Sequence, residues 1–92
     1  MPNQDQYIGV INEIIQKQSA ILGPDIALAK ARSVAGLKLG SDGAVVEISG
    51  DGQTVLQELV NSYIELSGEI VRNILNPIFQ KYPGVKLDIP SV

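Results

Sequence analysis

The 92-residue chain contains no cysteine, no histidine and no tryptophan. Without cysteine the chain can form no disulfide and offers no thiol nucleophile. Without histidine it lacks the side chain that most often acts as a general base and as a transition-metal ligand. We therefore expect no structural zinc, no haem or other cofactor, and no catalysis by a cysteine or by a histidine-activated serine.

Positive charge is also sparse. Seven Lys and Arg residues oppose ten Asp and Glu residues, which gives a formal net charge of −3. Only Lys30 and Arg32 lie close together among the basic residues, and such scattered charges are not the footprint of a nucleic-acid or anionic-lipid partner. We find neither a secretory signal nor an apolar run of about 18 residues. We expect no nucleic-acid or membrane partner, and a cytoplasmic location.

The length and composition of the chain predict one small domain, residues 1–92, with a modest core. Hydrophobic residues make up 45% of the sequence and charged residues 18%. The apolar content is too high for a disordered chain, and the charged fraction is low for the surface of a soluble monomer. This balance favours self-association.

The first third of the chain is predicted to form two helices. Apolar residues recur at the i, i+3, i+4 spacing over residues 4–22, which is typical of an amphipathic helix. Gly23 and Pro24 then signal a stop and a restart, so a second helix is expected over residues 24–35. Three alanines lie one turn apart in this second helix: Ala27, Ala31 and Ala35. Either these small residues let another backbone approach closely, or alanine is present simply as the best helix former.

After Gly36 the apolar period changes from 3.6 to 2. This predicts a β-hairpin with strands at about residues 37–40 and 44–49, joined by a turn at Gly40–Gly43. In the second strand, Val46 and Ile48 alternate with the residues on either side of them. Because an isolated hairpin is marginal in water, it must pack on helices or find further strands.

Residues 53–75 are predicted to form the longest helix, with apolar side chains around much of its circumference. A helix so broadly apolar needs partners on two sides, and in a chain this short we expect one of them to be a second subunit. Gly68, near its middle, indicates either a close crossing or slight bend, or an inert residue facing solvent. Asn76 and Pro77 end or kink the helix.

Residues 85–89 alternate between apolar and polar side chains and are predicted to form a third strand, stopped by Pro90. Its pairing partner, in the same chain or in a neighbour, is left open by the pattern. The sequence thus predicts an α+β fold: two N-terminal helices, a β-hairpin, one long helix and a C-terminal strand, assembled as a homodimer.

The acidic residues are the remaining candidates for site chemistry. Asp42 and Asp51 lie in glycine-containing turns, where they either serve turn geometry and helix capping or contribute to a site for a hard cation. Glu58, Glu65 and Glu69 lie at helical spacing, as either a solvated stripe or an acid–base pair. We favour the structural interpretations, so the sequence predicts no catalytic residue and no metal site.

The leading functional hypothesis is a non-catalytic, homodimerising association domain of a regulatory or scaffold type. Its interface is expected on the long helix, at Leu59, Tyr63, Leu66 and Ile70. The alternative is a small-molecule sensing or carrier domain, in which the helices and the hairpin enclose an apolar pocket. A cavity of a few hundred Å³ lined by convergent polar groups would favour this alternative.

Overall fold

The computed structural model describes residues 4–82. The elements follow the order α1 (Gln4–Leu22), α2 (Pro24–Arg32), β1 (Leu37–Leu39), β2 (Val45–Ile48), α3 (Gly52–Ser67) and α4 (Glu69–Lys81). This order confirms the α+β class and the prediction of two N-terminal helices followed by a hairpin. The strand predicted at residues 85–89 lies outside the described residues, and the homodimer stays a prediction.

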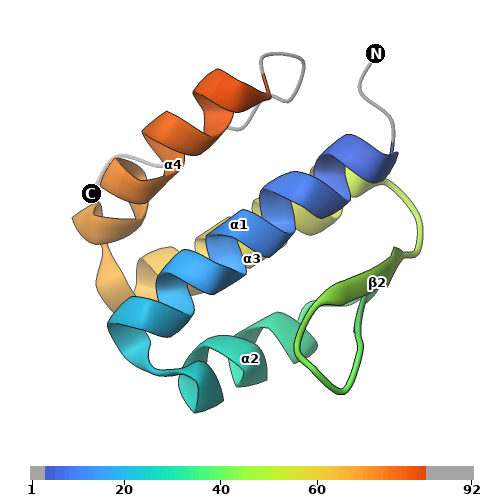
Figure 1. Cartoon of the computed structure of the whole chain (residues 1–92), viewed down its shortest axis with the longest axis horizontal. Coiled ribbons are helices and arrows are strands. Elements are labelled where there is room, and N and C mark those ends of the chain that lie inside the picture. Colours follow the sequence, from blue (N-terminus) through green and yellow to red (C-terminus); the bar gives the residue numbers. More distant parts are fainter. Residues whose placement is uncertain (1–3, 83–92) are drawn as a thin grey trace.

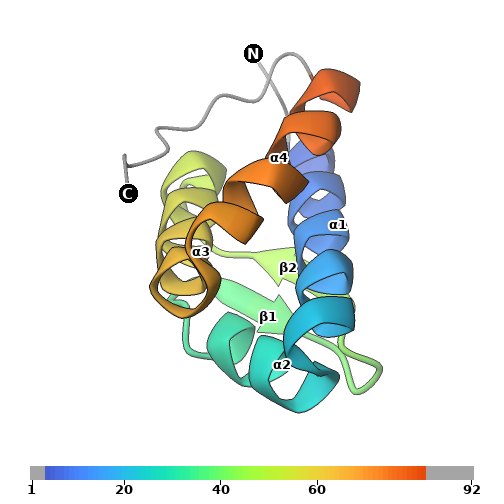
Figure 2. The same cartoon turned by 90° about the vertical axis from the view of Figure 1, so that its left-hand side faces the viewer.

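Helices α1 and α3 run in the same direction through the middle of the molecule and pack on each other (Figure 1). Helix α4 returns in the opposite direction along one side of this pair and contacts both helices (Figure 2). Helix α2 and the hairpin cover the other side. As a result, α1 turns into α2 and α3 turns into α4 at the same end of the molecule.

Helix α1 contributes a broad part of the core. Five of its residues are buried: Val10, Ile11, Ile14, Ile15 and Gln18. They recur at the i, i+3, i+4 spacing of a helix face, as the sequence predicts. This face packs against α2, α3, α4 and β2, so α1 is the element on which most of the fold converges.

Helix α2 is packed between α1 and α3 through its alanines. Ala27 and Ala31 are fully buried, which supports the close-approach interpretation at these two positions. The helix ends at Arg32 and not at residue 35, so Ala35 lies beyond it and is exposed. The Tyr63 hydroxyl of α3 donates a hydrogen bond of 2.7 Å to the backbone oxygen of Ala27 and so joins the two helices inside the core.

The hairpin contains a bulge that the alternating pattern does not reveal. Leu37 pairs with Ile48 and Leu39 with Val45, and the register shifts between Lys38 and Leu39. Strict alternation would place Val46 and Ile48 on one face, but the extra residue moves Val46 to the solvent side and brings Val45 into the core with Ile48. The Val45 backbone N–H donates to the Asn12 side-chain oxygen of α1 at 2.8 Å, which docks β2 on that helix.

The single long helix predicted at residues 53–75 is wrong, because the chain breaks at Gly68. This glycine has φ 56° and ψ −122°, a conformation that residues with a Cβ rarely adopt. Helix α3 ends there and α4 folds back over α3 and α1. The chain itself thereby supplies a second packing partner for α3, the role that the sequence assigns to a second subunit.

The ends of these two helices also differ in part from expectation. Asp51 is the N-cap of α3, and its carboxylate accepts hydrogen bonds from the Thr54 backbone N–H and hydroxyl at 3.3 and 2.8 Å. The structure therefore uses Asp51 for helix capping, as the structural interpretation of this residue predicts. Of the two alternatives at Asn76 and Pro77, an end or a kink, the end is wrong, because α4 continues through this proline to Lys81.

Gly68→Ala tests the helix break, because a break and a continuous helix predict changes of opposite sign in the free energy of unfolding. A Cβ at this position would meet no atom within 4 Å, so the cost comes from the backbone conformation alone. We expect the free energy of unfolding, measured by urea titration, to fall by about 1–3 kcal/mol. If α3 and α4 formed one continuous helix, the same substitution would instead stabilise the protein by about 1 kcal/mol.

Tyr63→Phe tests the buried hydroxyl. Its loss is expected to lower the free energy of unfolding by about 0.5–1.5 kcal/mol at pH 7, because the bond to Ala27 is removed from the core. Tyr7→Phe is the matched control, since the Tyr7 hydroxyl is only half-buried and donates to Gln53 at 3.2 Å, and we expect it to cost less.

The burial of Tyr63 also predicts that the free energy of unfolding depends on pH, and Tyr63→Phe is the variant for comparison. Burial raises the pKa of Tyr63 above its ordinary value of 10.0, so the native state keeps a proton that the unfolded state releases. The contribution of the protonated Tyr63 hydroxyl to the free energy of unfolding is fully present below pH 10 and is lost as the pH rises further. Relative to Tyr63→Phe, the wild-type protein should lose up to about 1.4 kcal/mol per pH unit above pH 10 in urea titrations. Parallel stability curves from pH 8 to 11 would contradict the prediction.

Candidate functional site

The four residues predicted to form the interface do not share one surface. Leu59 and Tyr63 are fully buried inside the single chain. Leu66 and Ile70 lie on either side of Gly68 and are 43% and 46% exposed. The physical reason is the break at Gly68, which folds α4 against the helix that carries Leu59 and Tyr63. Of the four predicted interface residues, Leu66 and Ile70 are the two that remain accessible to a partner.

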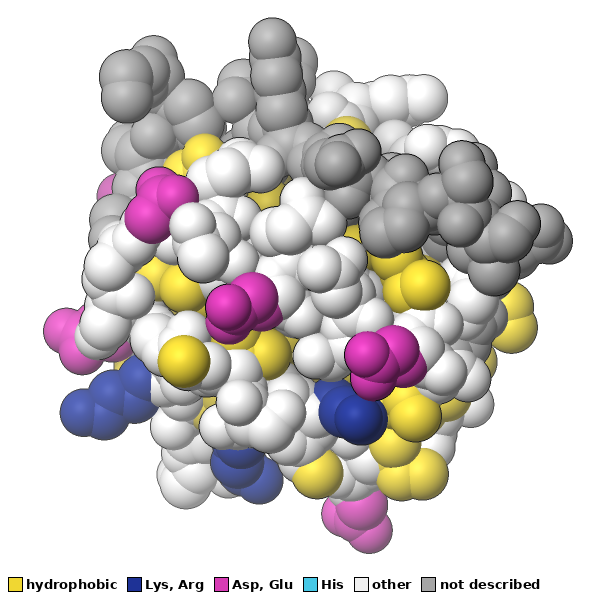
Figure 3. Space-filling model, turned by 180° about the vertical axis from the view of Figure 1, so that it is seen from behind, with side chains coloured by type: hydrophobic (Ala, Val, Ile, Leu, Met, Phe, Trp, Pro, Cys, Tyr) yellow, Lys and Arg dark blue, Asp and Glu magenta, His cyan; other side chains and the backbone are white. Residues whose placement is uncertain are grey.

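Two further large apolar side chains are exposed at the same end of the molecule. Ile21 is in the last turn of α1 and Ile26 is in the first turn of α2, and they are 45% and 51% exposed. All four residues therefore lie where a helix ends or begins at that end (Figure 1). We call this surface the apolar end: Ile21, Ile26, Leu66 and Ile70. The view from behind shows hydrophobic side chains gathered toward the end at which α2 begins, with charged side chains beside them (Figure 3).

Ile26 and Ile21 were missed as surface residues by the sequence reasoning. Ile21 belongs to the apolar repeat of the first helix, and the repeat alone does not show that the last turn of the helix extends beyond the core. For Ile26 a signal was present, because it lies off the alanine stripe and one turn from Lys30. A residue that shares its helix face with a lysine is more consistent with the outer surface.

The outer face of α2 carries an ordered set of charges next to Ile26. Asp25 is in the first turn of the helix, and Lys30 and Arg32 are in the last turn. Between them a shallow hollow of about 450 Å³ runs along this face, past Ile26 and the small side chain of Ala29. Opposite charges at the two ends and a small residue in the middle are features that a second, antiparallel helix can match.

The acidic residues occupy different parts of the structure. Glu58 and Glu65 are exposed on α3, and Glu69 is the first residue of α4. Asp51 caps α3, and Asp42 shapes the hairpin turn by accepting a 3.1 Å hydrogen bond from the Ala44 backbone N–H. Within residues 4–82, no three acidic side chains come together in a way that could hold a metal ion.

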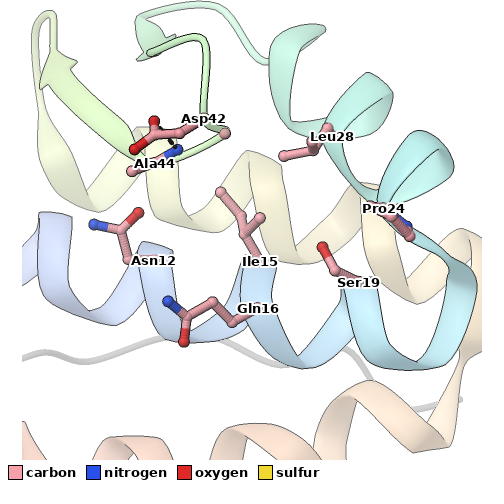
Figure 4. A pocket seen from close by; sticks show the side chains of 9 residues that line it. Asn12, Ile15, Gln16, Ser19, Pro24, Leu28, Asp42 and Ala44 are labelled. Carbon is pink, nitrogen blue, oxygen red and sulfur yellow. Dashed lines mark hydrogen bonds between the residues drawn. The ribbon is translucent and has the colours of Figure 1, made fainter.

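A second hollow, of about 460 Å³, lies between α1, α2 and the hairpin turn. We call it the hairpin hollow. Asn12 and Gln16 of α1 and Asp42 of the hairpin turn line one end of it from opposite sides (Figure 4). At the other end Ile15 and Leu28 point into the space. The hairpin hollow therefore has the volume of a small-molecule pocket and both polar and apolar side chains in its lining.

None of the helices in the described part of the chain is long and apolar enough to cross a membrane. Comparisons with known protein families, with curated proteins and with solved structures found no match for this chain.

Proposed function

We propose that this chain is a non-catalytic association domain that pairs with a second copy of itself through the apolar end. The observation that carries the proposal is the position of the exposed aliphatic side chains. Within residues 4–82, four of the five large hydrophobic residues that are exposed lie at one end of the molecule, and the fifth, Val46, lies on the hairpin. Contiguous exposed apolar side chains rimmed by charge are typical of interaction surfaces.

The charge order of α2 supports a second copy as the partner. A two-fold axis through the middle of α2 would place two of these helices antiparallel. Asp25 of one copy would then face Lys30 and Arg32 of the other, while Ala29 near the axis would let the helices approach. The same patch would thus be complementary to itself, which is what a two-fold interface requires.

The size of the apolar end predicts a weak pair. A standard stable interface buries about 800 Å² on each partner, and four half-exposed aliphatic side chains supply only part of that area. We expect dissociation constants in the micromolar range or weaker, with most of the binding energy supplied by residues at the centre of the apolar end.

Ile26→Glu and Leu66→Glu test the surface. Sedimentation equilibrium from about 10 to 500 μM should show reversible dimerisation of the wild-type protein, and each variant should weaken it at least tenfold, because a buried unpaired carboxylate is costly. Val46→Glu is the matched control, since Val46 is 58% exposed but lies on the hairpin, and it should leave the dimer intact. A wild-type protein that stays monomeric throughout this range overturns the proposal.

A charge exchange tests the second copy specifically. Asp25→Arg should weaken dimerisation, because it places like charges opposite each other across the two-fold axis. The double variant Asp25→Arg with Arg32→Asp should recover part of the lost affinity, since opposite charges meet again between positions 25 and 32 while Lys30 is unchanged. Failure of the double variant to recover would argue against the antiparallel pairing of α2 even if dimers form.

A further inference from the structure

We propose that the hairpin hollow binds a small organic cation, a primary ammonium group attached to a short apolar body. The inference concerns a different surface from the apolar end and does not depend on dimerisation. It rests on the shape of the hollow, on the contacts that hold its walls, and on the charge and polarity of its two ends.

The walls of the hollow are held in place by the docking of the hairpin turn on two helices. On α1, the Asn12 side-chain oxygen accepts the 2.8 Å hydrogen bond from Val45. On α2, Leu28 packs against Gly43, where an added Cβ would come within 2.9 Å of the leucine side chain. Gly43 also has φ 86°, so the turn uses a glycine both for its conformation and for this close contact. A cavity between elements joined in this way is formed before a ligand arrives, which lowers the cost of binding.

The polar end of the hollow favours a cation. Among the described residues that line the hollow, Asp42 alone is charged, and its charge is negative. One of its oxygens accepts from the Ala44 N–H, which holds the carboxylate beside Ala44 on the hairpin turn, on the other side of the hollow from Asn12 and Gln16 (Figure 4). An ammonium group beside Asp42 would form a charge-assisted hydrogen bond, and the two carboxamides add neutral donors and acceptors. An anion would meet the Asp42 charge, and none of the described lining residues is a basic one that could offset it.

The opposite end favours an apolar body of limited length. Ile15, Pro24 and Leu28 line it, with the Ser19 hydroxyl between them. The volume of about 460 Å³ lies toward the lower end of the range for small-molecule pockets, which is roughly 300–1,000 Å³. The ligand class is therefore an amine with one small ring or a short alkyl chain, held by Asp42 at its charged end.

The test uses three ligands of the same shape and different charge: benzylamine, benzyl alcohol and benzoate. Each is titrated into the isotopically labelled full chain, and the amide signals of Gly43 and Ala44 and the methyl signals of Ile15 and Leu28 are followed by NMR. We expect saturable shifts with benzylamine at millimolar concentration, at least tenfold weaker binding of benzyl alcohol, and no saturable shifts with benzoate.

Asp42→Asn removes the negative charge and keeps a side-chain oxygen that can accept from Ala44, so the turn is expected to persist. It should weaken benzylamine binding at least tenfold. Asp51→Asn is the matched control, because it removes the same charge at a helix cap outside the hollow and asparagine caps equally well. Three results would overturn the proposal: no saturable shift with benzylamine up to about 20 mM, benzoate binding as well as benzylamine, or wild-type affinity in Asp42→Asn.

Discussion

The fold depends on the need of α1 to bury a broad apolar face. Val10, Ile11 and Ile14 are fully inaccessible, and no single neighbouring helix could cover that width. The chain solves this by packing α2, α3, α4 and β2 around the same helix. The position of each of these elements is therefore set by the part of α1 that it packs against. The apolar end and the hairpin hollow lie at the borders of this packing.

Gly68 decides which of the apolar surfaces stay available for a partner. If α3 and α4 were continuous, the second half of a long helix would extend away from the core and would need a partner molecule. The positive φ at Gly68 instead turns α4 back, so Leu59 and Tyr63 are buried within the chain. What remains exposed is the set of helix ends beside the two reversals, including Leu66 and Ile70. The apolar end is thus a consequence of the two chain reversals, from α1 to α2 and from α3 to α4.

The hairpin contributes less to the core than to the shape of the surface. Its bulge turns Val46 to solvent and lets Val45 and Ile48 pack inward. Its turn rests on α1 through Asn12 and on α2 through the contact between Leu28 and Gly43. These contacts leave a hollow with an acidic end and an apolar end. A two-stranded sheet that is too small to be stable alone is in this way held firmly enough to form one wall of a cavity.

The sequence by itself determined the class of the fold, the bounds of α1, the start of α2, the position of the hairpin and the lack of cysteine and histidine chemistry. These follow from local rules: apolar period, helix caps and turn residues act over a few neighbouring positions. Tertiary structure alone decided that Gly68 is a break, that a bulge changes the face of Val46, and that Leu59 and Tyr63 are buried within the single chain. The local pattern is compatible with either alternative at each of these positions, and the long-range packing of α4, the hairpin and α2 around α1 selects between them.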